Sequence, residues 1–315
     1  MSKSPKPKVV AVVGATATGK TGLGIELALA AGGEVVNGDS RLFYRGMDIA
    51  TAKPSTEEMR GVPHHLIDFL DPDESFSLAD YLDRARAVIG EISSRNKVPI
   101  LAGGSGQYLW ALLEGWEVPR IEHDFELRSE LEKILDSEGV EALADRLAQL
   151  APEVAESTDL KNPRRVIRAI ERFHSGVTEA DSGRQKADEP PYDVQIIGLS
   201  AERATLHQRV LDRLDSMLEN GWKAEVEQLL ASGYSTDDHA LSGIGYRQMI
   251  GHLAGEYDHD EAVRLTAVAT NRLIRRQNNW FKQNDPRITW YDMTDESEVA
   301  NTVIISSISD WLNNS

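Results

Sequence analysis

Four short apolar runs along the chain predict the strands of a sheet. Three of them lead into a glycine-rich or acidic turn, and segments with apolar residues at helical spacing follow. Strands that alternate with helices in this way are typical of a parallel sheet covered by helices. The runs lie at residues 9–13, 34–39, 98–102 and 194–199. We therefore expect an α/β fold built on one parallel sheet.

The helical segments show the same regularity. The clearest begins at Ser77, a residue type that favours helix starts, and continues to Arg95. Its apolar positions recur every three or four residues, as one buried helix face requires. They are Leu78, Tyr81, Leu82, Ala85, Val88, Ile89 and Ile92.

The strand pattern stops between the third and the fourth run. Residues 119–191 are highly charged, have a helical pattern and end in Ala187-Asp188-Glu189-Pro190-Pro191, which resembles a linker. The fourth run then restores the strand pattern, so the sheet is interrupted rather than finished. We predict a catalytic core of residues 1–118 and 192–315, with a helical insertion domain at 119–191.

Composition narrows the class of protein. The chain has no cysteine, which excludes disulfides, a thiol nucleophile and cysteine–zinc sites. The basic tail Met1–Lys6 precedes only a five-residue apolar run, unlike a signal peptide, and no stretch is long enough to cross a bilayer. We expect a cytoplasmic monomer. The net charge of −17 argues against a nucleic-acid partner, unless basic residues are locally concentrated.

The first strand leads directly into a phosphate-binding motif. Its loop fits the pattern G-x-x-x-x-G-K-[ST] and is followed by a helix. Backbone N–H groups, the helix N-terminus and the Lys20 ammonium together form an anion site, and Thr21 is placed to hold a Mg²⁺ ion that the phosphates share. We predict a P-loop NTPase-like fold whose diphosphate or triphosphate site consists of Gly14, Ala15, Thr16, Ala17, Thr18, Gly19, Lys20 and Thr21.

A carboxylate, Asp39, ends the second predicted strand. The carboxyl ends of parallel strands lie at one edge of the sheet, so Asp39 should lie near the phosphate loop. There it would serve as a general base or as an acceptor that orients a nucleophile. The alternative is an Asp-Ser pair that caps a turn or helix. Residues 41–53 mix basic and aromatic side chains, and we expect a functional loop or short helix rather than a packed element.

A second glycine-rich turn, Gly103–Gly106, follows the third strand and should face the same edge. The strand carries no terminal Asp, where ATP-hydrolysing P-loop proteins have a Walker-B Asp that helps to bind magnesium. This absence disfavours an ATPase. The neighbouring pair His64 and His65 would point to opposite faces of an extended segment, so we predict a structural role rather than a shared metal.

Arginines are concentrated locally despite the acidic total. Within the insertion, Arg164, Arg165, Arg168 and Arg172 gather on one side of a predicted helix that starts at Pro163. This cluster favours an anionic partner over a merely solvated helix face. After the fourth strand, Arg209 and Arg213 lie one helical turn apart, placed to close over a phosphate.

A late basic segment combines arginines with amides and aromatic residues. Such a helix suits contact with RNA phosphates and splayed bases. The alternative is an ordinary amphipathic helix whose aromatic residues belong to the core. The segment contains Arg264, Arg272, Arg275, Arg276, Gln277, Asn278, Asn279, Trp280, Phe281 and Lys282, and it follows the acidic residues 258–261, which we expect at the helix N-terminus.

Taken together, these stretches resemble the tRNA dimethylallyltransferase family, also called tRNA isopentenyltransferases. The similarity spans nearly the whole chain, and the Asp-Ser pair followed by GMDIATAKP is more specific than the phosphate loop alone. The resembling stretches are GATATGKT (14–21), NGDSRLFYRGMDIATAKP (37–54), PHHLID (63–68), AGGSGQYLWALLEG (102–115), NPRRVIRAIE (162–171), GIGYRQM (243–249) and RRQNNWF (275–281).

The resemblance implies transfer of a dimethylallyl group from dimethylallyl diphosphate to the exocyclic N6 of adenosine 37, next to the tRNA anticodon. The phosphate loop would then hold a pyrophosphate group rather than ATP, with Thr21 and Mg²⁺ supporting it and Arg213 steadying the leaving group. Asp39 would be the base or acceptor for the attacking amine, and the insertion would grip the anticodon stem. The implied tRNA contacts are Asp39, Ser40, Arg41, Leu42, Ser105, Arg128, Arg164, Arg165, Arg168, Arg272, Arg275 and Arg276.

A few positions depart from the usual family pattern. Ala15 and Thr18 stand where many members have Pro and Ser, and Ser105 replaces a common Thr; all three keep the chemistry of their turns. Ser242 and Asn271 stand where basic residues are frequent, which puts individual RNA contacts in doubt. Three alternatives remain open: a small-molecule kinase, an isopentenyltransferase acting on free adenine nucleotides, and an RNA-binding protein without catalysis.

Overall fold

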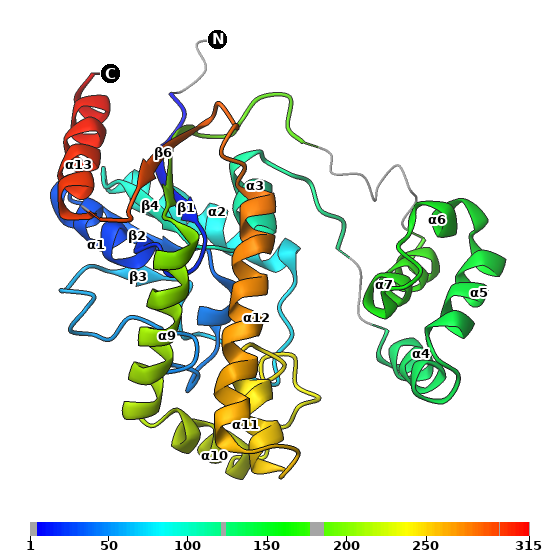
Figure 1. Cartoon of the computed structure of the whole chain (residues 1–315). Coiled ribbons are helices and arrows are strands. Elements are labelled where there is room, and N and C mark those ends of the chain that lie inside the picture. Colours follow the sequence, from blue (N-terminus) through cyan, green and yellow to red (C-terminus); the bar gives the residue numbers. More distant parts are fainter. Residues whose placement is uncertain (1–4, 121–123, 177–185, 296, 315) are drawn as a thin grey trace. The chain divides into compact units, whose positions relative to one another are not determined.

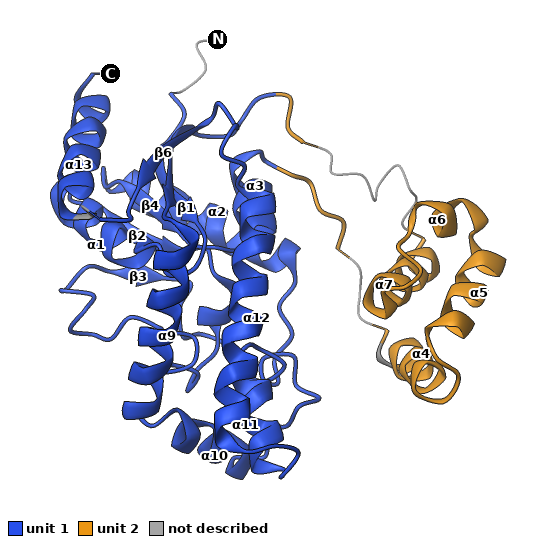
Figure 2. Ribbon diagram, in the orientation of Figure 1, with its two compact units in different colours: residues 1–115, 189–315 blue, residues 116–188 orange. Residues whose placement is uncertain are grey.

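The chain forms two compact units in a computed structural model (Figures 1 and 2). Unit 1 comprises residues 1–115 and 189–315, and unit 2 comprises residues 116–188. The structure describes residues 5–120, 124–176, 186–295 and 297–314, so most of the expected N-terminal tail lies outside the described residues. Each unit has its own hydrophobic core, and we describe each by itself.

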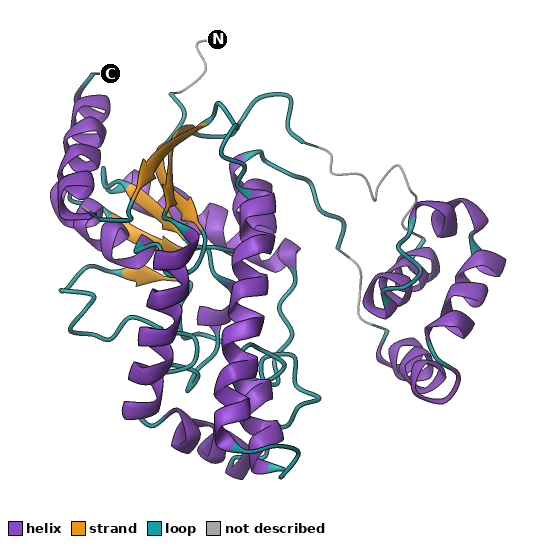
Figure 3. Ribbon diagram, in the orientation of Figure 1, coloured by secondary structure: helices purple, strands orange, loops and turns teal. Residues whose placement is uncertain are grey.

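Unit 1 is organised around a parallel sheet, which confirms the expected α/β fold (Figure 3). The described strands are β1 (Lys8–Gly14), β2 (Glu34–Asn37), β3 (His64–His65), β4 (Pro99–Ala102), β5 (Asp193–Ser200) and β6 (Ile288–Asp292), in the order β3-β2-β4-β1-β5-β6. The four predicted runs became β1, β2, β4 and β5. The two outer strands, β3 and β6, were not predicted: β3 has only two residues, and β6 (ITWYD) is only partly apolar.

Helices cover both faces of this sheet. On one face, α1 (Lys20–Ala31) packs against β1, β2 and β4 and also against the last helix, α13 (Ser297–Asn313). On the other, α2 (Leu78–Ser94) packs against β2 and β4 and is followed by α3 (Gly106–Leu113). Ser77 caps α2 as predicted: its hydroxyl accepts from the Asp80 N–H, and the Asp80 carboxylate accepts from the Ser77 N–H.

The C-terminal part of unit 1 extends beyond the sheet as a group of helices. They are α9 (Arg203–Glu219), α10 (Trp222–Ala231), α11 (Tyr246–Leu253) and α12 (His259–Trp280). The long helix α12 packs along α9, α11 and α3. Asp258 caps it by accepting from the Glu261 N–H at 2.8 Å, so the acidic cluster lies at the helix N-terminus as predicted. This helix therefore connects the helical end of the unit to the edge of the sheet.

Helices make up most of the described part of unit 2. Its helices are α4 (Phe125–Glu138), α5 (Val140–Leu150), α6 (Pro152–Ser157) and α7 (Pro163–His174). They enclose a core of leucines and β-branched residues, with Leu131, Leu143, Leu147, Val166 and Ile170 fully buried. Because this core is separate from that of the sheet, unit 2 has an independent source of stability.

The segment after Asp39 corrects one expectation. A short 3₁₀ helix, Ser40–Phe43, starts it, and Phe43, Tyr44 and Met47 are at most 4% exposed. Phe43 contacts the rings of Phe69, Phe76, Tyr81 and Tyr108. The expected short helix is therefore present, but the aromatic residues of this segment are buried, with Phe43 packed against Tyr81 of α2 and Tyr108 of α3 rather than facing solvent.

Candidate active site

Three turns meet at the carboxyl edge of the sheet. The phosphate loop follows β1, Asp39 lies just after β2, and Gly103–Gly106 follows β4, which lies between the other two strands. The strand order alone therefore brings these turns together, as the rule for parallel sheets anticipates. They surround a cavity of about 150 Å³ that is lined by Thr16, Ala17, Gly19, Lys20, Thr21, Gly22, Asn37, Asp39, Leu42, Thr51, Ala52, Ala102, Gly103 and Arg213.

The phosphate loop is folded tightly over its own backbone. Gly14 has φ 141°, and a Cβ atom there would lie 2.4 Å from the Leu199 carbonyl oxygen, so only glycine fits at this start of the loop. The Ala15 carbonyl accepts from the Thr18 hydroxyl at 2.8 Å and from the Lys20 ammonium at 2.5 Å. Lys20 thus crosses the loop and reaches the cavity that it lines.

The electrostatics of Lys20 follow from its position. Burial lowers the pKa of its ammonium to about 8; the nearby Asp39 carboxylate acts in the opposite direction, and the Arg213 guanidinium adds to the lowering. A diphosphate bound in the cavity would place negative charge next to the Lys20 ammonium and the Arg213 guanidinium. The site is therefore suited to an anion with more than one negative charge.

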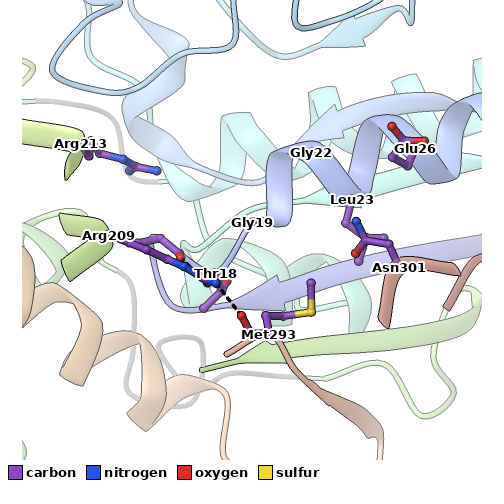
Figure 4. A pocket seen from close by; sticks show the side chains of 10 residues that line it. Thr18, Gly19, Gly22, Leu23, Glu26, Arg209, Arg213, Met293 and Asn301 are labelled. Atoms are coloured by element: carbon purple, nitrogen blue, oxygen red, sulfur yellow. Dashed lines mark hydrogen bonds between the residues drawn. The ribbon is translucent and has the colours of Figure 1, made fainter. Parts of the chain in front are cut away.

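Arg209 and Arg213 reach the phosphate loop from α9 (Figure 4). The Arg213 guanidinium donates to the Thr16 hydroxyl at 3.1 Å, and Arg209 donates to the Ala17 carbonyl at 3.4 Å and to the Met293 carbonyl at 2.6 Å. Arg209 is thereby fixed between the loop and the residues after β6. Arg213 lines both the cavity beside Asp39 and a second one of about 520 Å³ on the other side of the loop.

Asp39 is held by its neighbours at the end of β2. Its backbone N–H donates to the Asn37 side-chain oxygen at 2.8 Å, while the Asn37 amide donates to the Asp39 carbonyl and to the Leu66 carbonyl. The carboxylate accepts from the Arg41 N–H at 3.1 Å, so it caps the 3₁₀ helix, as the alternative reading anticipated. One oxygen is thus engaged, and the half-buried carboxylate also lines the cavity.

Oxygen donors suitable for Mg²⁺ lie at the same cavity. The Thr21 side chain is exposed and lines it together with the Asp39 carboxylate. Within the described ranges, no group of three or more His, Cys, Asp or Glu residues could hold a metal by itself. This donor set fits a Mg²⁺ ion that takes one or two protein oxygens and completes its shell with phosphates and water.

Gln277 was missed by the sequence reasoning, although it links two of the three turns. Its side-chain oxygen accepts from the Thr16 N–H at 2.8 Å, and its nitrogen donates to the Gly104 carbonyl at 3.1 Å. The side chain is only 5% exposed. A glutamine within a basic, amide-rich helix gave no sequence signal for this role, because its partners lie at distant positions in the chain.

Two glycines of the second glycine-rich turn allow α12 to pack closely against it. A Cβ atom on Gly104 would lie 2.2 Å from the Gln277 amide nitrogen, and one on Gly106 would lie 2.3 Å from the Trp280 Cβ. Ser105 also connects the turn to the segment after Asp39, since its hydroxyl accepts from the Ser40 N–H at 3.1 Å. Close approach of α12, rather than backbone flexibility, explains these glycines.

The predicted RNA-contacting residues of α12 divide into two groups. Arg272, Arg275 and Arg276 are exposed. In contrast, Phe281 is 2% exposed and Trp280 packs on Gly106, so for these aromatic residues the structure favours the alternative of core packing over stacking on bases. The Trp280 carbonyl also accepts from the Trp110 indole at 3.0 Å. Core packing prevailed because the aromatic residues lie on the helix end that faces α3.

Arg41 has a structural contact of its own. Its guanidinium donates to the backbone carbonyls of His239 and Ala240 at 3.2 and 3.3 Å.

The neighbouring histidines His64 and His65 have separate partners. The His65 imidazole bonds to the Glu34 carboxylate at 2.7 Å, and His64 Nδ1 bonds to the Val62 carbonyl. These contacts tie the segments next to β2 and β3 to their surroundings.

In unit 2 the predicted arginines lie on α4 and α7. Arg128 and Arg168 both pair with the Glu171 carboxylate, at 3.1 and 3.0 Å, and Glu171 is 6% exposed. Arg164 and Arg165 are exposed in the first turn of α7, where Arg165 approaches Asp159 at 3.6 Å. The structure therefore presents an arginine-rich face in which Arg128 and Arg168 are fixed by a buried carboxylate, while Arg164 and Arg165 are exposed to solvent.

The fold and the site define a P-loop enzyme of the transferase class, with Asp39 facing the phosphate loop and without an acidic residue at the end of β4. Residues 42–284 match the family model for IPP transferases. The chain belongs to this family of prenyl-transferring enzymes, whose bacterial members include the tRNA dimethylallyltransferases. No helix in the described part of the chain is long and apolar enough to cross a membrane.

Individual relatives agree with this assignment. The tRNA dimethylallyltransferase of Halalkalibacterium halodurans is 43% identical over 92% of each chain. The crystal structure of the tRNA isopentenylpyrophosphate transferase from Bacillus halodurans is similar with a TM-score of 0.72 and 40% identity, covering 97% of this chain and 96% of that one. A eukaryotic dimethylallyltransferase acting on tRNA has a TM-score of 0.81 at 25% identity, covering 98% of this chain and 80% of that one.

Proposed function

We propose that this enzyme transfers a dimethylallyl group from dimethylallyl diphosphate to N6 of adenosine 37 in tRNA and releases pyrophosphate. The observation that carries the proposal is the single cavity shared by the phosphate loop, Arg213 and Asp39. One side of it offers cations and backbone N–H groups to a diphosphate. The other side offers a carboxylate to an amine, and the lining between them includes the small or apolar residues Leu42, Ala52 and Ala102.

In the proposed reaction, the N6 amine forms a bond to the allylic carbon while the bond from that carbon to the diphosphate oxygen breaks. Its electron pair leaves with the pyrophosphate. Charge therefore accumulates on the leaving oxygens, next to Lys20 and Arg213. When bound through the Thr21 hydroxyl, Mg²⁺ would add positive charge there. Because these cations face the breaking bond, they stabilise the transition state more than the intact donor.

Asp39 has the complementary task. A neutral exocyclic amine becomes positively charged as it attacks, and its surplus proton must leave. The Asp39 carboxylate accepts a hydrogen bond from this amine and takes or directs its proton. The bond from the Arg41 N–H to one carboxylate oxygen fixes the orientation of the group and leaves the other oxygen for the substrate.

The tRNA contacts are proposed for two surfaces. The insertion expected at residues 119–191, which overlaps unit 2, grips the anticodon stem through the arginines of α4 and α7. The exposed arginines of α12 contact the phosphate backbone. Local basic faces of this kind bind RNA phosphates in spite of an acidic total. Next to the cavity, Ser40, Leu42 and Ser105 surround the acceptor nucleotide. Both substrates are water-soluble, and we propose a monomer that acts in the cytoplasm.

A direct assay tests this function. The enzyme is incubated with an anticodon stem-loop and dimethylallyl diphosphate, and prenylation at N6 is measured; parallel reactions contain ATP in place of the donor, or AMP in place of the RNA. We expect prenylation of the RNA only. Phosphoryl transfer from ATP, or prenylation of AMP alone, would replace the proposal by a kinase or a free-nucleotide isopentenyltransferase. Asp39→Ala should abolish most turnover and leave stem-loop binding within about threefold, because Asp39 acts in the transition state.

A further inference from the structure

The loop between Met47 and Lys53 forms one wall of the cavity. Thr51 and Ala52 line the cavity from this loop, and Ala52 adopts φ 53°, which is unusual for a residue other than glycine. The backbone N–H groups that precede them belong to no helix or strand. A side chain from outside the loop that accepts from these N–H groups would therefore also hold the wall in place.

Glu225, on α10, satisfies these groups. One of its carboxylate oxygens accepts from the Asp48 N–H at 2.8 Å and from the Ile49 N–H at 2.7 Å. The other oxygen accepts from the Ala50 N–H at 3.4 Å. Three successive N–H groups thus converge on one side chain. Only a carboxylate offers enough acceptor positions for this arrangement, since the glutamine amide carries a single acceptor oxygen.

A buried tyrosine completes the arrangement from α11. The Tyr246 hydroxyl donates to Glu225 at 2.7 Å, and the residue is 1% exposed. Burial and the neighbouring Glu225 charge raise the pKa of this hydroxyl, so it remains a donor. Gly245 lies beneath the loop, because a Cβ atom there would come within 2.9 Å of the Ala50 Cβ. Within the GIGYRQM stretch, Gly245 and Tyr246 therefore support the loop.

We propose that Glu225 is a positioning residue for the prenyl-donor site. It touches no atom of the cavity itself. It fixes residues 48–50, and through them it places Thr51 and Ala52 opposite the phosphate loop. This inference rests on the proposed function. A carboxylate that merely joins α10 to the loop would stabilise the fold and leave the donor site unaffected, and the two roles differ in measurable ways.

The test compares Glu225→Gln with Glu227→Gln. Glu227 lies on the same helix, is exposed and pairs only weakly with Lys223 at 3.6 Å, so it controls for loss of a charge from α10. The readouts are the KM for dimethylallyl diphosphate, kcat, the KM for the stem-loop, and hydrogen exchange of the amides of residues 48–50. Exchange does not depend on activity and reports directly on the loop.

For Glu225→Gln we expect faster exchange at these amides and a donor KM about tenfold higher, which corresponds to the loss of about one hydrogen bond to a charged group. The stem-loop KM should stay within twofold, and Glu227→Gln should match the wild type. Tyr246→Phe, which removes one donor only, should shift both readouts in the same direction by less. Faster exchange with an unchanged donor KM would overturn the proposal, as would an unchanged exchange rate. Failure of the proposed function itself would appear in the wild type, which would then not prenylate RNA.

Discussion

Replacing Gln277 by methionine should weaken the junction between α12 and the two glycine-rich turns. Methionine keeps the approximate volume of the side chain, so the packing change is small. It removes both hydrogen bonds, at 2.8 Å to the Thr16 N–H and at 3.1 Å to the Gly104 carbonyl. A buried polar group left without a partner costs about 1–3 kcal/mol. Thr16 is only half-buried and can recover a bond to water, so we expect a total loss of about 2–4 kcal/mol in the free energy of unfolding unit 1.

Urea unfolding of the full chain, together with hydrogen exchange at the Thr16 amide, measures this loss. The matched control is Asn278→Ala, the next residue on α12, which is exposed and should change the free energy by less than about 0.5 kcal/mol. The donor KM should also rise for Gln277→Met. Gln277 holds Thr16, and the Thr16 hydroxyl accepts a hydrogen bond from the Arg213 guanidinium at the donor site. A Gln277→Met protein as stable as the control, with an unprotected Thr16 amide in both, would refute the reasoning.

Three further predictions concern charge and packing. The pKa of Lys20 is lowered to about 8, so its ammonium is charged below that pH and loses its proton above it. The donor KM should therefore be flat below pH 8 and rise by up to about tenfold per pH unit above it. Lys20→Arg should remove the rise, and a rise in both proteins would contradict this assignment. Arg164→Ala should weaken stem-loop binding and reduce the slope of log K against log salt by about 0.7–0.9, whereas an unchanged slope would exclude a phosphate contact. Gly106→Ala, which places a methyl group against Trp280, should cost about 1–3 kcal/mol in thermal unfolding; Gly90→Ala, in open space on α2, should stabilise slightly, and equal effects would refute the packing argument.

The sheet and its site edge were predictable because they depend on local patterns. Each of the four inner strands, β2, β4, β1 and β5, contains an apolar run, and the parallel order follows from alternation with helices. The phosphate loop and Asp39 follow the first two of these runs, so the topology had to bring them to one edge. The outer strands β3 and β6 lie outside this logic, because neither is an apolar run and each pairs with one inner strand at the margin of the sheet.

The contacts that support the site were not predictable. Gln277 and Glu225 act through side-chain bonds to backbone groups that lie far away in the sequence. The same limit explains why the packing of two aromatic-rich segments could not be decided from the sequence. Phe43 and Trp280 belong to segments with charged and polar neighbours, but Phe43 packs on Tyr81 of α2 and Trp280 packs on Gly106 of α3, and the local sequence does not reveal these partners.

The position of β1 has a consequence for how the chain folds during synthesis. β1 lies between β4 and β5, so half of its partners are translated only after unit 2. The partner of the Lys8 ammonium at the start of β1 is translated later still, since this group donates to the carbonyl of Trp311 at 2.7 Å. The described helices of unit 2, α4 to α7, by contrast, find their partners within residues 116–188. On the ribosome, the inserted unit should therefore acquire its core first, and the sheet that carries the catalytic edge should close only when the last helix has emerged.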